Sequence, residues 1–259
     1  MRKLIITLLV FTLFDVSAQE FTMKPKGKVS DITVVVQNLF TDLEIEGSNS
    51  PEIRVQADDY EGTPEKATGL RPLSALGPDN SGIGLNIDQS GNTVTISGTH
   101  RNRDQSDYKI ILPANIKLRV DYGSYRSDDI LIRGMTNEVE VKSMVGDLEF
   151  EDVTGPIIAT TLSADIEIEF SSINQVSPTS ITSVSGDIDV TIPSDSKGNF
   201  SLSSTSGEIY TDLDLEVTRS HGMQRWGPGM FAAEAKLNGG GVDITIKSVS
   251  GDIFIRKGD

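Results

Sequence analysis

The sequence predicts an all-β fold, and within that class a β-solenoid of stacked coils of about 20 residues each. Three observations favour it. A ten-residue segment recurs along the chain, apolar residues alternate with polar ones in short runs, and almost no amphipathic helical pattern follows residue 18. The alternative is a β-sandwich, in which a turn would recur about every 8 to 12 residues.

The recurring segment reads ITSVSGDIDV at residues 181–190 and TIKSVSGDIF at residues 245–254. Three variants of it centre on Gly146, Ala164 and Gly207, so the intervals between the five units are 18, 22, 21 and 44 residues. The last interval is about twice the others. It predicts that one coil has lost its motif or has been replaced by a loop.

Each unit predicts two short strands joined by a sharp corner. Apolar residues stand five positions before the glycine and two and four positions after it, the alternation of strands with one buried face. Glycine permits the positive φ of a sharp corner, and the acidic residue after it favours a turn. Stacked units would close a continuous core. The predicted corner residues are Gly146, Asp147, Asp165, Gly186, Asp187, Gly207, Glu208, Gly251 and Asp252.

Weaker copies of the unit extend toward the N-terminus. Residues 36–45 place Asp42, and residues 125–132 place Asp129, in the register of the later acidic residues, each with two apolar residues after it. Residues 61–84 are rich in proline and glycine, and residues 85–97 predict a hairpin. We therefore predict one domain over residues 19–259. It would have irregular coils and a long loop (61–84) in residues 19–118, and regular coils and a second loop (216–241) in residues 119–259.

Residues 1–18 have the pattern of a signal peptide. Arg2 and Lys3 precede an apolar run of 11 residues that ends at Phe14, and Ser17-Ala18 suits a cleavage site. The run is too short for a membrane helix, which needs about 20 residues. Because no cysteine follows, an N-terminal lipid is excluded. The chain is therefore expected to be exported to the periplasm, the cell surface or the medium, without a transmembrane segment.

Charge and cysteine content limit the partners. The formal net charge is −15, which argues against nucleic acid as a partner. The chain has no cysteine, so neither disulfides nor thiolate metal sites contribute.

In these repeated units the chain resembles the bacterial adhesin-like family classed as domain of unknown function 4097, whose members carry Ser-x-Ser-Gly-Asp-Ile units behind a signal peptide. The matching residues are 183–188, 204–209 (with Glu208 in place of Asp) and 248–253. The resemblance covers residues 30–257. It implies a solenoid-like fold and an envelope or surface setting, and it supplies no catalytic residues.

The units themselves predict no catalytic, cofactor or metal site. A row of equivalent serines selects no nucleophile, and the two histidines lie near no nucleophile motif. Stacked carboxylates at the corners repel one another unless amides or a cation compensate. We expect amides to do so, and bound calcium is the alternative, although the sequence lacks the glycine-rich calcium repeat.

Two further segments suggest contacts with partners. The segment HGMQRWGPGMF contains His221, Arg225, Trp226 and Phe231. It predicts either that Trp226 folds back onto the coil that the segment interrupts, which is the favoured interpretation, or a contact loop for an envelope protein or a glycan. The final unit runs almost to the chain end. We therefore expect the last coil to expose unpaired strand edges that self-associate or dock on a partner, unless an earlier loop covers them.

Two function classes remain. The favoured one is a non-enzymatic, exported, adhesin-like envelope protein that presents a solenoid surface for binding or assembly. The alternative is a carbohydrate-active enzyme, a polysaccharide lyase or hydrolase, on a β-helix scaffold. A groove in which two carboxylates and a basic residue converge would favour the enzyme.

Overall fold

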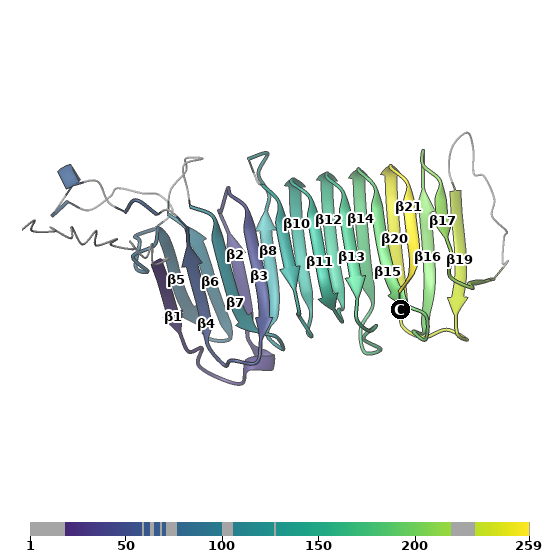
Figure 1. The fold of residues 1–259 in the computed structure, drawn as a ribbon, viewed down its shortest axis with the longest axis horizontal. Helices are drawn as coiled ribbons and strands as arrows, with labels where there is room; N and C mark the ends of the chain where they lie inside the picture. The colour runs from purple at the N-terminus through teal and green to yellow at the C-terminus, as the bar shows by residue number, and fades with distance from the viewer. Residues whose placement is uncertain are drawn as a thin grey trace, which may run out of the picture.

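The protein is an elongated stack of two long β-sheets (Figure 1). The computed structural model describes residues 19–258, except for 59, 63, 64, 68, 71–76, 100–105, 127 and 219–230. In this part of the chain, strands are joined by turns, and two short 3-10 helices, η1 (Val29–Asp31) and η2 (Glu65–Ala67), are the helical elements. None of its helices has the length and apolar character needed to span a membrane.

We call the ten-stranded sheet sheet A and the eleven-stranded sheet sheet B. In spatial order, sheet A contains β1 (Gln19–Met23), β4 (Ile53–Ala57), β7 (Tyr108–Pro113), β3 (Leu43–Ser48), β9 (Ile130–Arg133), β11 (Leu148–Val153), β13 (Ile166–Phe170), β15 (Ile188–Pro193), β21 (Ile253–Gly258) and β17 (Ile209–Thr211). Sheet B contains β18 (Glu216–Val217), β19 (Phe231–Leu237), β16 (Gly198–Ser204), β20 (Asp243–Ser250), β14 (Thr179–Ser185), β12 (Ile157–Ser163), β10 (Val139–Val145), β8 (Lys117–Tyr122), β2 (Thr33–Gln37), β6 (Thr93–Gly98) and β5 (Leu85–Ser90).

Each coil gives one strand to each sheet. From β8–β9 to β14–β15 the coils stack in chain order, and neighbouring strands pair in parallel with the repeat in register. For example, Val141, Ala159 and Ile181 are successive partners across three strands of sheet B. The predicted solenoid of strand, corner and strand is therefore confirmed, and the sandwich alternative is not.

The chain order and the stacking order differ at both ends. The last coil, β20–β21, lies between the β14–β15 coil and the β16–β17 coil (Figure 1, yellow between green). Likewise, the early β2–β3 coil lies between β6–β7 and β8–β9. The expectation that the last coil exposes unpaired edges is therefore wrong, because both of its strands are paired on both sides.

Antiparallel strands close the stack. At one end β4 pairs with β7 and β1, and the predicted hairpin is formed by β5 and β6. At the other end β19 pairs with β16 and β18. The 44-residue interval thus holds strands β18 and β19, which lie within the range expected to be a loop (216–241). The described part of the other expected loop, 61–84, holds η2.

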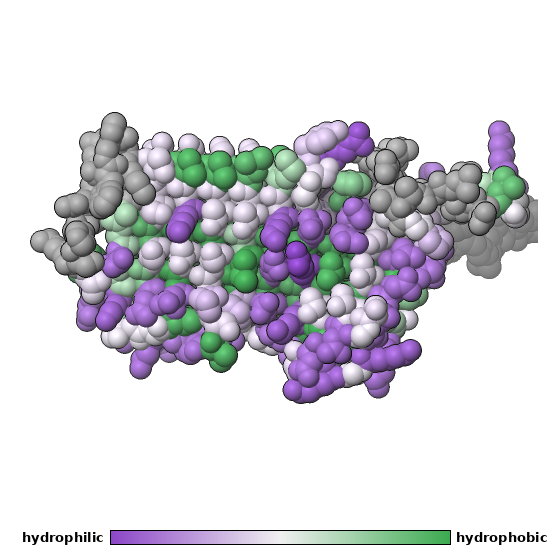
Figure 2. Space-filling view, turned by 180° about the vertical axis from the view of Figure 1, so that it is seen from behind, coloured by the Kyte–Doolittle hydropathy of each residue, from purple (hydrophilic) through white to green (hydrophobic). Residues whose placement is uncertain are grey.

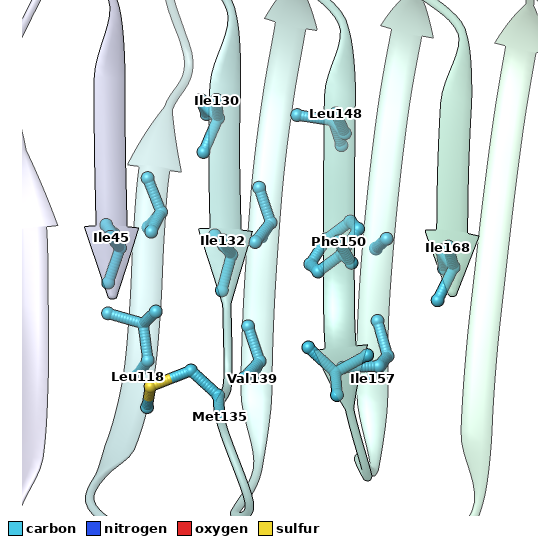
Figure 3. Packing of buried hydrophobic residues seen from close by; sticks show 14 of the residues in the cluster. Ile45, Leu118, Ile130, Ile132, Met135, Val139, Leu148, Phe150, Ile157 and Ile168 are labelled. Carbon is cyan, nitrogen blue, oxygen red and sulfur yellow. The ribbon is translucent and has the colours of Figure 1, made fainter. Parts of the chain in front are cut away.

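Apolar columns between the sheets form one continuous core. In sheet A, Ile45, Ile132, Phe150 and Ile168 are register partners and are almost completely buried (Figure 3). A column of Leu118, Val139 and Ile157 runs along sheet B. Burial of one such side chain stabilises the fold by about 1.5–3 kcal/mol. The core holds the backbone rigid, so outward side chains stand in straight rows on each outer face.

Candidate binding surfaces

The corner glycines are required mainly by the close approach of successive coils. A Cβ at Gly146, Gly186, Gly207 or Gly251 would lie only 2.0–2.2 Å from a backbone carbonyl oxygen of the neighbouring coil. Positive φ, the reason expected from the sequence, applies to Gly146 (88°) and Gly186 (142°), whereas Gly207 and Gly251 are not in that region. The shared requirement is therefore space between coils.

The acidic residues that follow form a hydrogen-bonded ladder from coil to coil. The amide N–H of each residue donates to a carboxylate oxygen of the residue before it in the stack, at 2.7–3.3 Å. The spatial order is Asp42, Asp129, Asp147, Asp165, Asp187, Asp252 and Glu208. The carboxylates thus cap amides of the neighbouring coil, where the sequence suggested a turn within the same coil. Within the described residues no group of three or more histidine or acidic side chains is arranged to hold a metal ion.

A row of buried hydroxyls lies three positions before each corner. The hydroxyls of Ser183 and Ser204 donate to carbonyl oxygens of the neighbouring coil, Ala164 and Gly251, at 3.3 and 3.0 Å. The Thr161 and Ser248 hydroxyls are buried without a hydrogen-bond partner among the described residues. This row lies inside the stack and offers no nucleophile to a substrate in solution.

The outer face of sheet A is rich in acid. Its outward side chains include Glu44, Glu46, Glu149, Glu151, Glu167, Glu169 and Asp189. Three cations neutralise part of this charge. Lys109 contacts Glu44 and Glu46 at 3.0 and 2.8 Å, Arg133 contacts Glu44 and Glu151, and Arg256 contacts Asp189.

The outer face of sheet B is nearly neutral and carries an exposed apolar row. Hydroxyl side chains dominate its middle strands, β10, β12, β14, β20 and β16. The charged residues on these five strands are Glu140, Lys142, Asp243 and Lys247. Next to the corners, Leu162, Val184 and Val249 are 47, 39 and 44% exposed, and Met144 is partly exposed. These four residues, which we call the apolar row, lie between register partners on β10, β12, β14 and β20 and therefore occupy equivalent positions. Figure 2 shows apolar side chains gathered in a green band near its upper edge.

A groove borders sheet A where β7, β3 and β9 meet the corners. It has a volume of about 390 Å³ and is lined by acidic residues together with Tyr108 and Lys109. Burial, followed by the nearby carboxylates of Asp128 and Asp107, raises the pKa of Asp42 in this groove. The acidic lining residues are Asp42, Glu44, Asp58, Asp107, Asp129 and Glu149.

An aromatic pair stands at the other end of sheet A. The rings of Tyr210 on β17 and Phe254 on β21 are stacked, with centroids 5.4 Å apart and an interplanar angle of 12°. The guanidinium carbon of Arg256 lies 5.5 Å from the Phe254 ring centroid. Hydrogen bonds to Asp189 raise the pKa of Arg256.

The acidic corner residues predicted from the sequence are brought together in one ladder, and the corner glycines lie against the neighbouring coils. The predicted contact loop is not placed, since His221, Arg225 and Trp226 and the side chain of Phe231 lie outside the described residues. Sequence reasoning missed the apolar row. Its signal was present, because the position two before the corner is apolar in four of the five units (Met144, Leu162, Val184 and Val249, with Thr205 in the fifth).

The two-sheet stack and its corner ladder agree with one family profile. The profile of the Toastrack DUF4097 family matches residues 125–256, half of the chain. The chain belongs to this family. The match begins in the β8–β9 corner and ends within β21, so in this chain it includes both the sequential coils and the last coil, which lies between earlier ones.

Two solved structures are similar to the Toastrack chain. One, from Clostridium sporogenes and described as "a putative cell adhesion protein", is 12% identical, covers 93% of this chain and 100% of its own, and has a TM-score of 0.46. The other, from Bacteroides fragilis and described as "a putative adhesin", is 13% identical, covers 94% and 98%, and has a TM-score of 0.38. A search of curated proteins finds no match.

Proposed function

We propose that this Toastrack protein is exported and acts without catalysis, as an adhesin-like envelope or surface protein that binds a partner through the outer face of sheet B. The observation that supports the proposal most is the apolar row, in which Leu162, Val184 and Val249 are each about 40–50% exposed. Water-exposed apolar side chains repeated over successive coils are unfavourable in solution and mark contact surfaces.

The difference in charge between the faces supports the same surface. The acid-rich face of sheet A repels anionic envelope components, whereas the hydroxyl-rich face of sheet B carries few charges to desolvate. The rigid core keeps the row straight, so a partner meets a preorganised surface and little conformational entropy is lost on binding.

The binding test compares two triple variants on the same strands. Leu162→Glu, Val184→Glu and Val249→Glu together change the apolar row, and Thr160→Glu, Thr182→Glu and Thr245→Glu add the same charge to neighbouring rows of β12, β14 and β20. Retention of labelled protein on cells of the native host should fall at least about tenfold for the first variant and stay within about twofold for the second. Equal losses in both variants would refute the apolar row as the contact.

Export is tested separately by fractionation of the native host. The protein should lie in the periplasm, on the surface or in the medium, with residues 1–18 removed. Retention in the cytoplasm with residues 1–18 intact would contradict the proposal.

The enzyme alternative has one observation in its favour, the acid-lined groove beside Lys109. In that groove the Lys109 ammonium is already paired with Glu44 and Glu46, and Asp42 accepts the amide of Asp129. These groups therefore hold the corner together. We expect no release of reducing ends from a panel of neutral and acidic polysaccharides. Turnover that disappears in Asp58→Asn would instead establish an enzyme.

A further inference from the structure

The aromatic pair at the end of sheet A interrupts an acidic row. Glu149, Glu167 and Asp189 are successive partners along this row, and Phe254 and Tyr210 occupy the same position in the next two coils. Cross-strand aromatic stacking stabilises a sheet, but that role is satisfied by the contact between the two rings. The contact between the rings covers only part of Tyr210, which is 51% exposed to water.

Polar groups beside the rings are held in fixed positions. Arg256 donates from Nε and Nη2 to the Asp189 carboxylate at 2.7–2.8 Å, and its guanidinium also lies against the Phe254 ring. The Asp212 carboxylate accepts the backbone N–H of Lys257 at 2.7 Å, which fixes it near the same strand end. Ring faces, donors and acceptors are thus ordered before any ligand arrives.

From this arrangement we infer that Tyr210, Phe254, Arg256 and Asp189 form a binding site for a neutral oligosaccharide. The electron-rich face of an aromatic ring attracts the weakly positive C–H groups on the apolar face of a sugar ring. Sugar hydroxyls both donate and accept, which suits a carboxylate beside a guanidinium. The Arg256–Asp189 pair has no net charge, and the nearby Glu167 and Asp212 together with the net charge of −15 disfavour an acidic sugar.

The chain offers a matched control in Tyr125. It is 71% exposed and lies 5.6 Å from the guanidinium carbon of Arg126, so it shares exposure and a cation with Tyr210. It stands on the corner between β8 and β9, away from the Tyr210–Phe254 pair. A general effect of losing an exposed tyrosine would appear in both variants.

The test is titration of the purified protein with linear neutral oligomers of glucose, mannose, galactose and N-acetylglucosamine, followed by calorimetry and by NMR of the sugar protons. One of these oligomers should bind, Tyr210→Ala should weaken its binding at least about tenfold, and Tyr125→Ala should leave it within about twofold. Arg256→Lys, which keeps the charge and loses the two-pronged geometry, should also weaken binding. Urea unfolding of each variant verifies that it is folded.

No binding of any neutral oligomer, equal affinity of Tyr210→Ala and the unchanged protein, or tighter binding of uronic acid oligomers would overturn the inference. It rests on the proposed function only for its setting, since export is what brings the chain to glycans. The two fail separately: cell binding that depends on the apolar row, without oligosaccharide binding, removes this inference and leaves the proposed function standing.

Discussion

The middle of the solenoid and its two ends use the same coil but stack it differently. From β8–β9 to β14–β15, each coil lies on the one before it in the chain. At the ends, the β2–β3 and β20–β21 coils each lie between two other coils, and at least one of these is not the next coil along the chain. The unit therefore specifies what a coil looks like, whereas its neighbour in the stack is chosen by long-range pairing.

Enclosure changes what the terminal coils contribute. Fraying concentrates at chain ends and at unpaired strand edges. Because β20 and β21 are paired on both sides and Ile246 and Ile253 are fully buried, the last coil belongs to the interior of the stack. Antiparallel strands and short strands occupy the true ends instead.

The largest effect should come from placing a side chain between coils in the interior. Gly251→Val sets a Cβ about 2.0 Å from the Gly186 carbonyl oxygen, and coils on both sides prevent relief. We expect the free energy of unfolding to fall by about 3 kcal/mol or more, measured by urea denaturation. Gly207→Val creates an equal clash against Gly251, but Gly207 leads into β17, the edge strand of sheet A, which can shift outward. A loss at Gly207 as large as at Gly251 would contradict enclosure.

A smaller effect should follow from the ladder. Asp187→Ala removes the acceptor for the Asp252 amide, bonded at 2.8 Å, and should destabilise by about 1–2 kcal/mol. Asp187→Asn keeps an acceptor and should cost only a fraction of that. Glu208→Ala, at the end of the ladder, should be nearly neutral, because within the described residues no amide donates to its carboxylate. A melting temperature of the unchanged protein that rises when calcium is added, with no such rise in Asp187→Asn, would point to a metal ladder instead.

The smallest effects should be in the pH dependence of two acids near the N-terminal end. Burial would raise the pKa of Asp79, but hydrogen bonds from the Gly84, Gly82 and Ser81 amides and the Ser81 hydroxyl outweigh it and lower this pKa. Asp79 therefore stabilises the fold above the unfolded pKa, and this contribution is lost as pH falls through the lower folded value. Asp42 has a raised pKa, so its ionisation opposes folding as pH rises through the folded value.

The two acids should thus give opposite slopes. Between about pH 2 and 7, the stability of the unchanged protein relative to Asp79→Asn should grow with pH, and relative to Asp42→Asn it should shrink. Denaturation midpoints of both variants at several pH values measure this. Slopes of the same sign would show that hydrogen bonds at Asp79 and burial at Asp42 do not shift the two pKa values in opposite directions.

Much of the fold followed from local pattern. The alternation around Gly186 and Gly251 predicted strand, corner and strand, and the early acidic residues Asp42 and Asp129 were placed in the correct register, since both join the ladder. Stacking order did not follow, because the SVSGDI segments at residues 183–188 and 248–253 are identical and either could lie on either neighbour. Local sequence carries no information on that choice.

The site followed only in part. The corner acids were found because a turn needs them, yet their acceptor role between coils depends on which coil is adjacent. The pair Tyr210 and Phe254 was not foreseen, since the two residues are 44 positions apart in the sequence and only the structure shows that their strands are neighbours. The reversed order of the last two coils places Phe254 beside Asp189 and leaves Tyr210 on the edge strand of sheet A.

The order of the coils is tested most directly by disulfide cross-linking, since the chain has no cysteine of its own. Thr182 on β14 and Lys247 on β20 are outward register partners, and Lys247 is also the partner of Ser203 on β16. Cysteines at adjacent parallel positions lie within the range of a disulfide, and cysteines two strands apart, at about 9–10 Å, do not. On mild oxidation, Thr182→Cys with Lys247→Cys and Lys247→Cys with Ser203→Cys should each cross-link within one chain, whereas Thr182→Cys with Ser203→Cys should not. Efficient cross-linking of Thr182→Cys with Ser203→Cys, together with loss of the cross-link between Thr182→Cys and Lys247→Cys, would show that the coils stack in chain order and would contradict the account.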